Sequence, residues 1–510
     1  MSGDHDFNVE YTKKKKIAFI GISSLMMLGM VVAVTIGIKD TGNGGKYNDD
    51  DDGLATSSKA ARSVCHVVEH RHACERTLAH VHTSDPNKIV QTTFNAAVVK
   101  LEGALAKSSS IKVKKDDPRT AGALETCKEA MEYAIGDLKR SIDQMGHFDL
   151  RKKDECVENM RVWLSSSMTF LETCIDAFEN TTGDAEEKMK SMLNAPRELT
   201  CNSMDVATEL YTIFKSLKNT NTSQAHKRSH AEEEDVVVSK DGSGKFKTIT
   251  DALKEVPHID ANKVGTIVNK TFVIYIKDGI YEEEVRVEAT MSNVMFVGDG
   301  PTKTIITGKK SFADGFSLYK TATISIMGRN FIAKDITFEN SAGTIDFIFG
   351  NAAAVFQNTR LVLRKPLDDQ DCVITAQGRL NVKGPTGFIL QNCTIMADPL
   401  YYPLRHKNKA FLGQPRKKFA RTIVLESYLA DSIDAEGWKQ WSGKFGKDTC
   451  YFAEFENRGP GATLMGRAKW HGIKKISKHE ADGFTPEKFY DGNRWIRPTG
   501  VPYVPGMVPK

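Results

Sequence analysis

The chain has 510 residues, of which 40% are hydrophobic and 26% are charged. The length exceeds one ordinary core, so we expect at least two domains, and the hydrophobic fraction excludes a mostly disordered chain. The net charge of +5 slightly favours polyanions such as acidic polysaccharides, and we expect no nucleic-acid partner.

The N-terminus predicts a membrane segment. Residues 1–16 end in four lysines, and residues 17–38 form a run of 22 residues without a charge, which is long enough to cross a bilayer. The lysines predict a cytosolic tail with the bulk of the chain on the other side. Without a convincing small-residue cleavage site, a retained signal anchor is favoured over a cleaved signal peptide. Residues 39–58 are a Gly- and Asp-rich linker.

Residues 59–217 show helical periodicity with little glycine and no strand-like alternation. Apolar side chains recur every three or four residues. Examples are Val98, Leu101 and Leu105; Met131, Ile135, Leu138 and Ile142; and Met168, Leu171, Ile175 and Phe178. The pattern predicts an all-α helical bundle.

Cysteines and glycosylation triplets fit the secretory pathway. In an oxidising compartment, Cys65 with Cys74 and Cys127 with Cys174 are natural disulfide partners, although sequence alone does not give the connectivity. Asn-x-Ser/Thr acceptor triplets begin at Asn180, Asn221, Asn269 and Asn392.

Histidines gather at the start of the helical region. His66 and His70 are spaced by one helical turn and would suit a shared metal, but a solvated helix face explains them as well. Because no carboxylate or cysteine in the local sequence completes a ligand set, we expect no metal.

A polar linker at residues 218–235 contains the dibasic pair Lys227 and Arg228, which is either a processing site or ordinary linker charge. From residue 236 to the end at 510, short strand-like runs recur. They cover residues 271–276, 294–297, 323–326, 332–338, 354–363, 388–395 and 422–429. Ile332 and Phe356 are 24 positions apart, about one coil of a solenoid, so we predict stacked β coils.

One segment of the strand region carries a candidate catalytic group. Asp346 lies between Ile345 and Phe347 and is followed by a glycine turn at Gly350. Partial desolvation by bulky neighbours would tune the proton affinity and nucleophilicity of this carboxylate.

Several motifs recur in one order along the chain. They are residues 240–249 (KDGSGKFKTI), 279–283 (GIYEE), 298–301 (GDGP), 335–340 (DITFEN), 343–353 (GTIDFIFGNAA), 374–379 (ITAQGR) and 457–462 (NRGPGA). Together they resemble plant pectin methylesterases. Residues 65–74, the Cys127 segment and residues 161–174 resemble the pectin methylesterase inhibitor domain that precedes many of these enzymes.

The resemblance implies a fold, a site and a location. It implies a disulfide-pinned helical bundle followed by a right-handed parallel β-helix, with methylated homogalacturonan as the substrate and no cofactor. Asp346 takes the place of the nucleophile, and Phe347 is assigned to substrate contact. The expected location is the secretory membrane or the cell wall, with active pectin methylesterases as further partners through the helical domain.

Departures from the family pattern concern the same site. The Gln-Ala-Val and Gln-Asp-Thr segments of the family, which carry the acid/base Asp and the oxyanion glutamines, are absent because Gly343 is fused directly to Thr344. The Leu-Gly-Arg-Pro-Trp motif is altered, so Gln414 replaces the arginine and Arg416 the tryptophan. We keep both as degenerate substrate-binding positions.

The cysteine pattern departs as well. Thr359 stands where relatives place a cysteine bridged to the position of Cys393, which leaves Cys372 as the expected substitute partner. Cys156 and Cys201 are extra to the inhibitor-domain pattern and form either a third bridge or thiols.

Two functions compete at this point. One is a pectinesterase whose missing coils reflect an incomplete gene sequence. The other is an inactive protein that binds pectin or regulates active relatives, and the losses at Gln414 and Arg416, which lie outside the fused junction, favour it. A purely structural wall protein ranks third.

Overall fold

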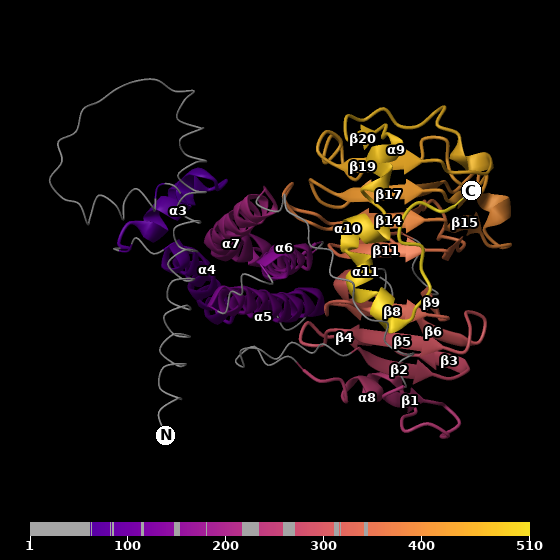
Figure 1. Ribbon diagram of the computed structural model, residues 1–510, viewed down its shortest axis with the longest axis horizontal. Helices are drawn as coiled ribbons and strands as arrows, with labels where there is room; N and C mark the ends of the chain where they lie inside the picture. The colour runs from indigo at the N-terminus through magenta and orange to yellow at the C-terminus, as the bar shows by residue number, and fades with distance from the viewer. Residues whose placement is uncertain are drawn as a thin grey trace, which may run out of the picture. The chain divides into compact units, whose positions relative to one another are not determined.

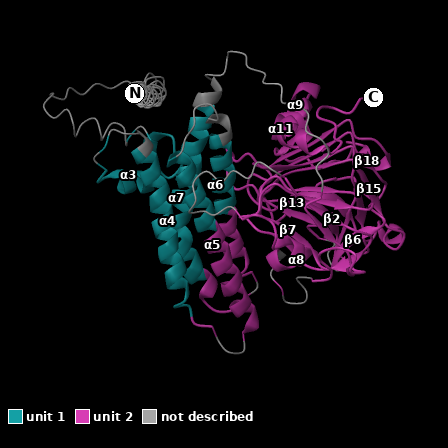
Figure 2. Cartoon of the chain, turned by 60° about the horizontal axis from the view of Figure 1, so that its bottom comes forward, with its two compact units in different colours: residues 1–111, 134–168, 187–221 teal, residues 112–133, 169–186, 222–510 magenta. Residues whose placement is uncertain are grey.

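The computed structural model describes residues 62, 64–81, 83, 86–113, 117–146, 153–179, 181–216, 234–258, 271–310, 316, 318–340 and 345–509. The chain forms two compact units (Figure 2): residues 1–111, 134–168 and 187–221, and residues 112–133, 169–186 and 222–510. The predicted domain boundaries at 59–217 and 236–510 stay a prediction, because residues 112–133 and 169–186 group with the strands.

Long helices occupy the N-terminal region, as the periodicity predicts. They are α3 (Arg71–Leu78), α4 (Pro86–Ser108), α5 (Pro118–Gly146), α6 (Lys153–Asp176) and α7 (Ala185–Ser216). α4 and α5 both begin at a proline, whose missing N–H costs nothing in the first turn of a helix. Within the first unit, Leu101 and Leu138 are fully buried, so the predicted apolar stripes form its core.

None of the described helices is long and apolar enough to cross a bilayer. The predicted anchor at residues 17–38, with the tail before it and the linker after it, lies outside the described residues.

Two disulfides connect the pairs that the sequence favoured. Cys65 is bonded to Cys74, and Cys127 in α5 is bonded to Cys174 in α6. Cys156 and Cys201 are buried thiols, so the alternative of a third bridge between them is not realised.

Parallel strands build the rest of the second unit, and they fall into two stacks of coils (Figure 1). The first stack consists of β1 (Val236–Val238), β2 (Phe272–Ile276), β3 (Gly279–Glu282), β4 (Val285–Val287), β5 (Val294–Gly298), β6 (Thr304–Gly308), β7 (Ile324–Ile326), β8 (Ile332–Lys334) and β9 (Thr337–Asn340). Its sheets have the orders β1-β2-β5-β8, β3-β6-β9 and β4-β7.

The second stack continues the same plan. Its strands are β10 (Ile348–Gly350), β11 (Ala353–Gln357), β12 (Arg360–Leu363), β13 (Cys372–Gln377), β14 (Gly387–Gln391), β15 (Thr394–Ala397), β16 (Ala410–Pro415), β17 (Arg421–Leu425), β18 (Tyr428–Leu429), β19 (Tyr451–Phe455) and β20 (Ile473–Lys474). The sheet orders are β10-β13-β16, β11-β14-β17-β19-β20 and β12-β15-β18. Each coil therefore places one strand in each of three sheets. The handedness of the winding stays a prediction.

Short helices complete the second unit. α8 (Ile249–Leu253) packs on the first stack, with its first turn capped by the Thr248 side chain. α9 (Lys478–Asp482), α10 (Pro486–Tyr490) and α11 (Gly492–Trp495) follow the last strand.

Several predicted single runs are in fact two strands with a sharp turn between them. The run 388–395 breaks at Asn392, and the run 354–363 breaks at Asn358, both with φ near the left-handed region at 51° and 55°. Asparagine tolerates this conformation because its short side chain bonds locally. Here Asn392 Nδ2 donates to Asn358 Oδ1 at 2.8 Å, 34 residues earlier. The turn residues therefore stack from coil to coil.

The expected spacing of 24 residues is wrong as a coil length. The register pairs Phe356 with Leu390 and Met295 with Ile332, and no described ladder joins Ile332 to Phe356. In the second stack the coil length is 34 residues, the separation of Gln357 and Gln391, whose side chains are hydrogen-bonded at 2.9 Å. The value of 24 spans the fused junction at Gly343 instead of one coil.

The expected bridge between Cys372 and Cys393 is absent, which corrects that prediction. Both are buried thiols in the core of the second stack. Cys372 opens β13 and its thiol donates to Arg364 O, whereas Cys393 lies in the turn after β14 and donates to Phe356 O. Burial raises the pKa of Cys372 to about 12 and that of Cys393 to about 11. Backbone acceptors thus satisfy the two sulfurs separately.

Of the four glycosylation triplets, those at Asn180, Asn221 and Asn269 lie outside the described residues. Asn392 is partly exposed, but Nδ2, the atom that would carry a glycan, donates to Asn358. Glycosylation at all four stays a prediction.

Candidate active site

Asp346 precedes β10 at the first coil of the second stack. Its backbone is left-handed, with φ of 56°, and the next residue is fixed to β13 because Phe347 N–H donates to Val373 O at 3.1 Å. The turn directs the aspartate inward: it is 5% exposed, whereas Ile345 and Phe347 are 41% and 37% exposed. The predicted desolvation of this carboxylate is therefore present.

Two predicted positions meet Asp346. Gln414, in β16, donates from Nε2 to Asp346 Oδ1 at 2.7 Å, and Arg416 Nη1 lies 3.9 Å from Asp346 Oδ2. The motif comparison places no cation beside the nucleophile, because a glutamine has replaced the arginine. A guanidinium nevertheless approaches from two positions further along the chain. At 3.9 Å the contact is an ion pair without a hydrogen bond.

The protonation equilibrium of Asp346 is shifted toward the acid. Burial raises its pKa above the usual range, and the charge of Arg416 and the hydrogen bond from Gln414 oppose the shift without cancelling it. A nucleophilic carboxylate must be ionised, so this shift works against attack at low pH.

Arg416 is divided among several partners in the second unit. Its Nη2 pairs with Asp176 at 3.2 Å, and its guanidinium carbon lies 5.8 Å and 5.7 Å from the ring centroids of Phe349 and Trp441. Lys417 Nζ also pairs with Asp176, at 2.8 Å. The guanidinium is thus shared between two carboxylates and does not serve Asp346 alone.

Sequence reasoning missed Trp441 and Asp176. Trp441 is 38% exposed and lies three residues after the fully buried Trp438, so a second tryptophan in a polar stretch was an available signal. Asp176 closes a helix far earlier in the chain, and nothing in its local pattern indicates a partner 240 residues away.

The 374–379 motif has a structural role. Gln377 Oε1 accepts from the backbone N–H of Arg379 and of Arg421, at 3.0 and 2.8 Å. The Arg379 guanidinium donates to the carbonyls of Phe419 and Val382, and burial lowers its pKa to about 9. These side chains tie neighbouring loops together and do not contact Asp346.

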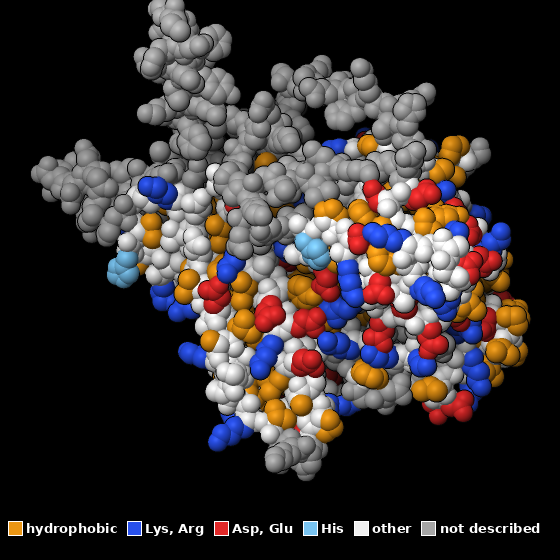
Figure 3. Space-filling model, turned by 90° about the horizontal axis from the view of Figure 1, so that it is seen from below, with side chains coloured by type: hydrophobic (Ala, Val, Ile, Leu, Met, Phe, Trp, Pro, Cys, Tyr) orange, Lys and Arg blue, Asp and Glu red, His pale blue; other side chains and the backbone are white. Residues whose placement is uncertain are grey.

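No proton donor stands beside the nucleophile among the described residues. The hydrogen-bond and ion-pair partners of Asp346 there are an amide and a guanidinium, and neither is a carboxyl group. Charge does not gather on the face drawn in Figure 3, where acidic and basic side chains are interspersed. The group that carries chemistry is therefore Asp346 with its two immediate partners.

Family profiles match most of the chain. The profile described as "Pectinesterase" matches residues 235–344 and 341–493, and "Plant invertase/pectin methylesterase inhibitor" matches residues 59–206. Coils of parallel strands with a buried aspartate, preceded by helices, are thus the two parts of one known domain pair. The chain belongs to the pectinesterase family and carries an N-terminal inhibitor-type domain.

Relatives share this organisation over nearly the whole chain. Pectinesterase/pectinesterase inhibitor 28 of Arabidopsis thaliana is 38% identical over 562 residues, covering 97% of this chain and 75% of the relative. Number 21 of the same plant is 36% identical over 576 residues, covering 99% and 84%. Among solved structures, the carrot pectin methylesterase is 34% identical, with a TM-score of 0.49, covering 55% of this chain and all of the carrot chain.

The alignments agree with a loss at the fused junction. The pectinesterase profile matches in two segments that meet at residues 341–344, where Gly343 joins Thr344. The two Arabidopsis alignments run over 562 and 576 positions, more than the 510 residues of the chain, so both relatives carry residues that this chain lacks.

Proposed function

We propose that this chain is a cell-wall protein that binds methylesterified homogalacturonan and has lost most of the ester hydrolysis of its family. One observation carries the proposal. The buried Asp346 contacts Gln414 and Arg416, and no carboxyl group among the described residues stands ready to donate a proton to the leaving methanol.

The chemistry of ester cleavage explains the expected loss. Attack by a carboxylate on a methyl ester expels methoxide, which needs a proton, and a positioned general acid contributes about 10²–10⁴ in rate. Donors to the oxyanion contribute about 10²–10³ more. The Gln414 amide, the nearest such donor, already bonds to Asp346 Oδ1 at 2.7 Å.

Binding is supported by groups beside the aspartate that remain accessible. Phe347 and Trp441 are 37% and 38% exposed, and Arg416 lies near Trp441. Exposed aromatic rings next to a cation suit a sugar chain that carries carboxylates and methyl esters, because the rings supply apolar area and the cation attracts the acid groups.

The test of this proposal is an affinity measurement on methylated pectin with the full chain. Phe347→Ala and Trp441→Ala should each weaken binding about tenfold, since truncating an aromatic anchor costs over about 1 kcal/mol. Tyr428→Ala is the matched control, because Tyr428 is also 37% exposed but lies on β18, in a different sheet. Equal binding by all four proteins would contradict the proposal.

The proposed location is the cell wall, reached through the secretory pathway with residues 17–38 as an anchor. The uncharged run after four lysines supports the anchor. Expressed in plant cells, the chain should sediment with membranes and resist extraction by alkaline carbonate. Recovery only in the soluble wall fraction would support a cleaved signal instead.

A second candidate function is regulation of active pectin methylesterases through the helical region. Two carboxylates near the end of α6, Glu172 and Asp176, pair with Lys417 and Arg416 next to Asp346. A helical segment that binds cations beside a pectinesterase nucleophile has the charge needed to bind an active relative.

Titrating the full chain into an active pectin methylesterase tests this candidate. Methanol release should fall, and Asp176→Asn should weaken the inhibition, whereas Glu179→Gln serves as the control on the same segment. Unchanged methanol release at all ratios would exclude the regulatory function.

A further inference from the structure

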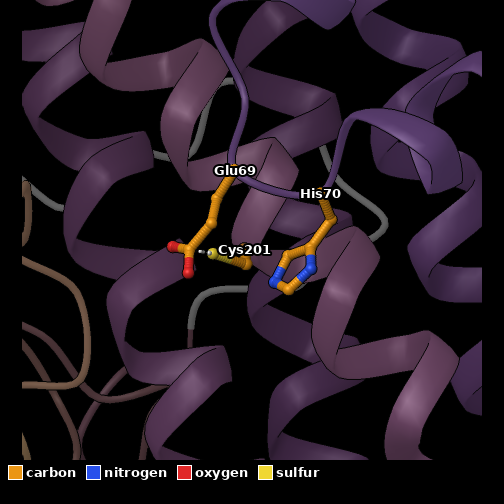
Figure 4. A group of neighbouring side chains, drawn as sticks. All are labelled: Glu69, His70 and Cys201. Atoms are coloured by element: carbon orange, nitrogen blue, oxygen red, sulfur yellow. Dashed lines mark hydrogen bonds between the residues drawn. The ribbon is translucent and has the colours of Figure 1, made fainter.

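A carboxylate, an imidazole and a thiol converge in the first unit, away from Asp346. Glu69 and His70 lie in the segment closed by the Cys65–Cys74 disulfide, and Cys201 lies in α7. One ligand atom from each residue lies within 4.8 Å of the other two. Figure 4 shows the thiol between the carboxylate and the ring.

The backbone around these groups is held in place. Glu69 N–H donates to Asp205 Oδ2 at 2.8 Å, and His70 N–H donates to Asn202 Oδ1 at 3.0 Å. Asn202 Nδ2 returns a hydrogen bond to His70 O at 3.0 Å. Three hydrogen bonds and the disulfide thus fix the segment against α7, so little ordering remains to be done when a ligand binds.

We propose that Glu69, His70 and Cys201 bind a borderline divalent metal ion, with Zn²⁺ as the best fit, and that the metal pins the disulfide-closed segment to α7. Thiolate, imidazole and carboxylate are the three ligand types that zinc uses in proteins. Calcium and magnesium prefer sites made of oxygen alone and fit this set poorly.

The geometry needs only a small adjustment. With zinc–ligand bonds of about 2.0–2.3 Å, ligand atoms at the corners of a tetrahedron lie about 3.3–3.8 Å apart. Cys201 Sγ already lies 3.6 Å from Glu69 Oε2, to which it donates a hydrogen bond. Zinc would take the place of that proton: the thiol releases H⁺, and the sulfur and the carboxylate both bind the metal. Glu69 is exposed, so water has access to the fourth position.

The local sequence could not predict this set. His66 and His70 were the expected pair, but residues 67–69 are bends and α3 begins at Arg71, so no helix places the two rings on one face. The partner that completes the set comes from α7, more than a hundred residues later, and its hydrogen bond to Glu69 spans 132 residues.

Cobalt substitution tests the proposal, since a thiolate bound to Co²⁺ gives a charge-transfer absorption band. Titration of the oxidised full chain with Co²⁺ should produce this band with one equivalent, and Zn²⁺ should abolish it. Cys201→Ser should remove the band, and His70→Gln should keep the band but weaken metal affinity at least about tenfold. Cys156→Ser is the matched control, because Cys156 is 5% exposed and Cys201 is 6% exposed.

Thermal unfolding provides a readout that survives a poorly folded variant. Zn²⁺ should raise the unfolding midpoint of the wild type and of Cys156→Ser, and it should leave Glu69→Gln with His70→Gln, both changes outside the core, nearly unaffected. Absence of the charge-transfer band in the wild type, or equal zinc stabilisation of the Glu69→Gln, His70→Gln protein, would overturn the proposal.

Discussion

The two stacks of coils differ most where they face the fused junction. In the second stack, every residue of the interior strands β13, β14 and β16 is buried. At the end of the first stack, β8 and β9 contain no buried residue, and the same holds for β10 and β11 at the start of the second. The fold is thus regular within each stack and loose at the faces between them.

Pairing explains this difference. Among the described strands, no ladder joins β7, β8 or β9 to β10, β11 or β12, and the apolar cores of the two stacks are separate clusters. A coil in a solenoid gains stability from its neighbours on both sides, so a coil with one neighbour loses about half of its interface. Asp346 belongs to such a coil, and the missing coils are those that would supply its helpers.

Restoring the missing coils should have the largest effect. Inserting between Gly343 and Thr344 the residues that the Arabidopsis relative number 28 carries there should raise methanol release at least about 10²-fold, because a general acid returns to the site. The gain should vanish when Asp346→Asn is added. An insertion that folds but stays inactive would show that the altered positions Gln414 and Arg416, and not the missing coils, limit catalysis.

Core truncation should separate the interior coils from the junction coils. Phe388 in β14 is 1% exposed, so Phe388→Ala should cost about 3–5 kcal/mol of unfolding free energy. Phe338 in β9 is only partly buried, so Phe338→Ala should cost less than half as much. Denaturant unfolding measures both, and equal costs would mean that the junction strands are packed as tightly as the interior ones.

The pH dependence of stability should report on Asp346. Its pKa is raised by burial, so the folded state binds this proton more tightly than the unfolded state, and stability falls as pH rises from the unfolded toward the folded pKa. Asp346→Asn removes the penalty and should raise the unfolding midpoint at pH 7, with the difference from the wild type disappearing near pH 3. A lower midpoint for the variant at pH 7 would mean that Arg416 outweighs burial.

The thiols of the second stack should give the smallest effect. Alkylation of the denatured, unreduced chain should modify Cys372 and Cys393 separately, because each sulfur has its own backbone acceptor. Before denaturation both should react slowly, since burial keeps them as neutral thiols. A peptide pair linked through these two cysteines would instead restore the bridge expected from sequence.

Local patterns predicted what depends on neighbours in the chain. Period-three-to-four apolar residues located α4, α5 and α6, and the apolar flanks of Asp346 predicted its burial. Turn residues were harder: the run 388–395 reads as one strand because a single left-handed Asn392 is enough to divide it.

Long-range partners were beyond the sequence. The approach of Arg416 to Asp346 depends on β13 lying between β10 and β16, and Glu69 meets Cys201 only because two loop N–H groups bond to α7. The coil length was misjudged because the two residues compared lie on opposite sides of the fused junction.

Methanol release from methylated pectin by the purified full chain, measured beside Asp346→Asn, tests the central claim most directly. We expect the two proteins to match each other and a protein-free blank, because a buried aspartate without a proton donor does not turn over the ester. Turnover by the wild type that Asp346→Asn abolishes would contradict the account.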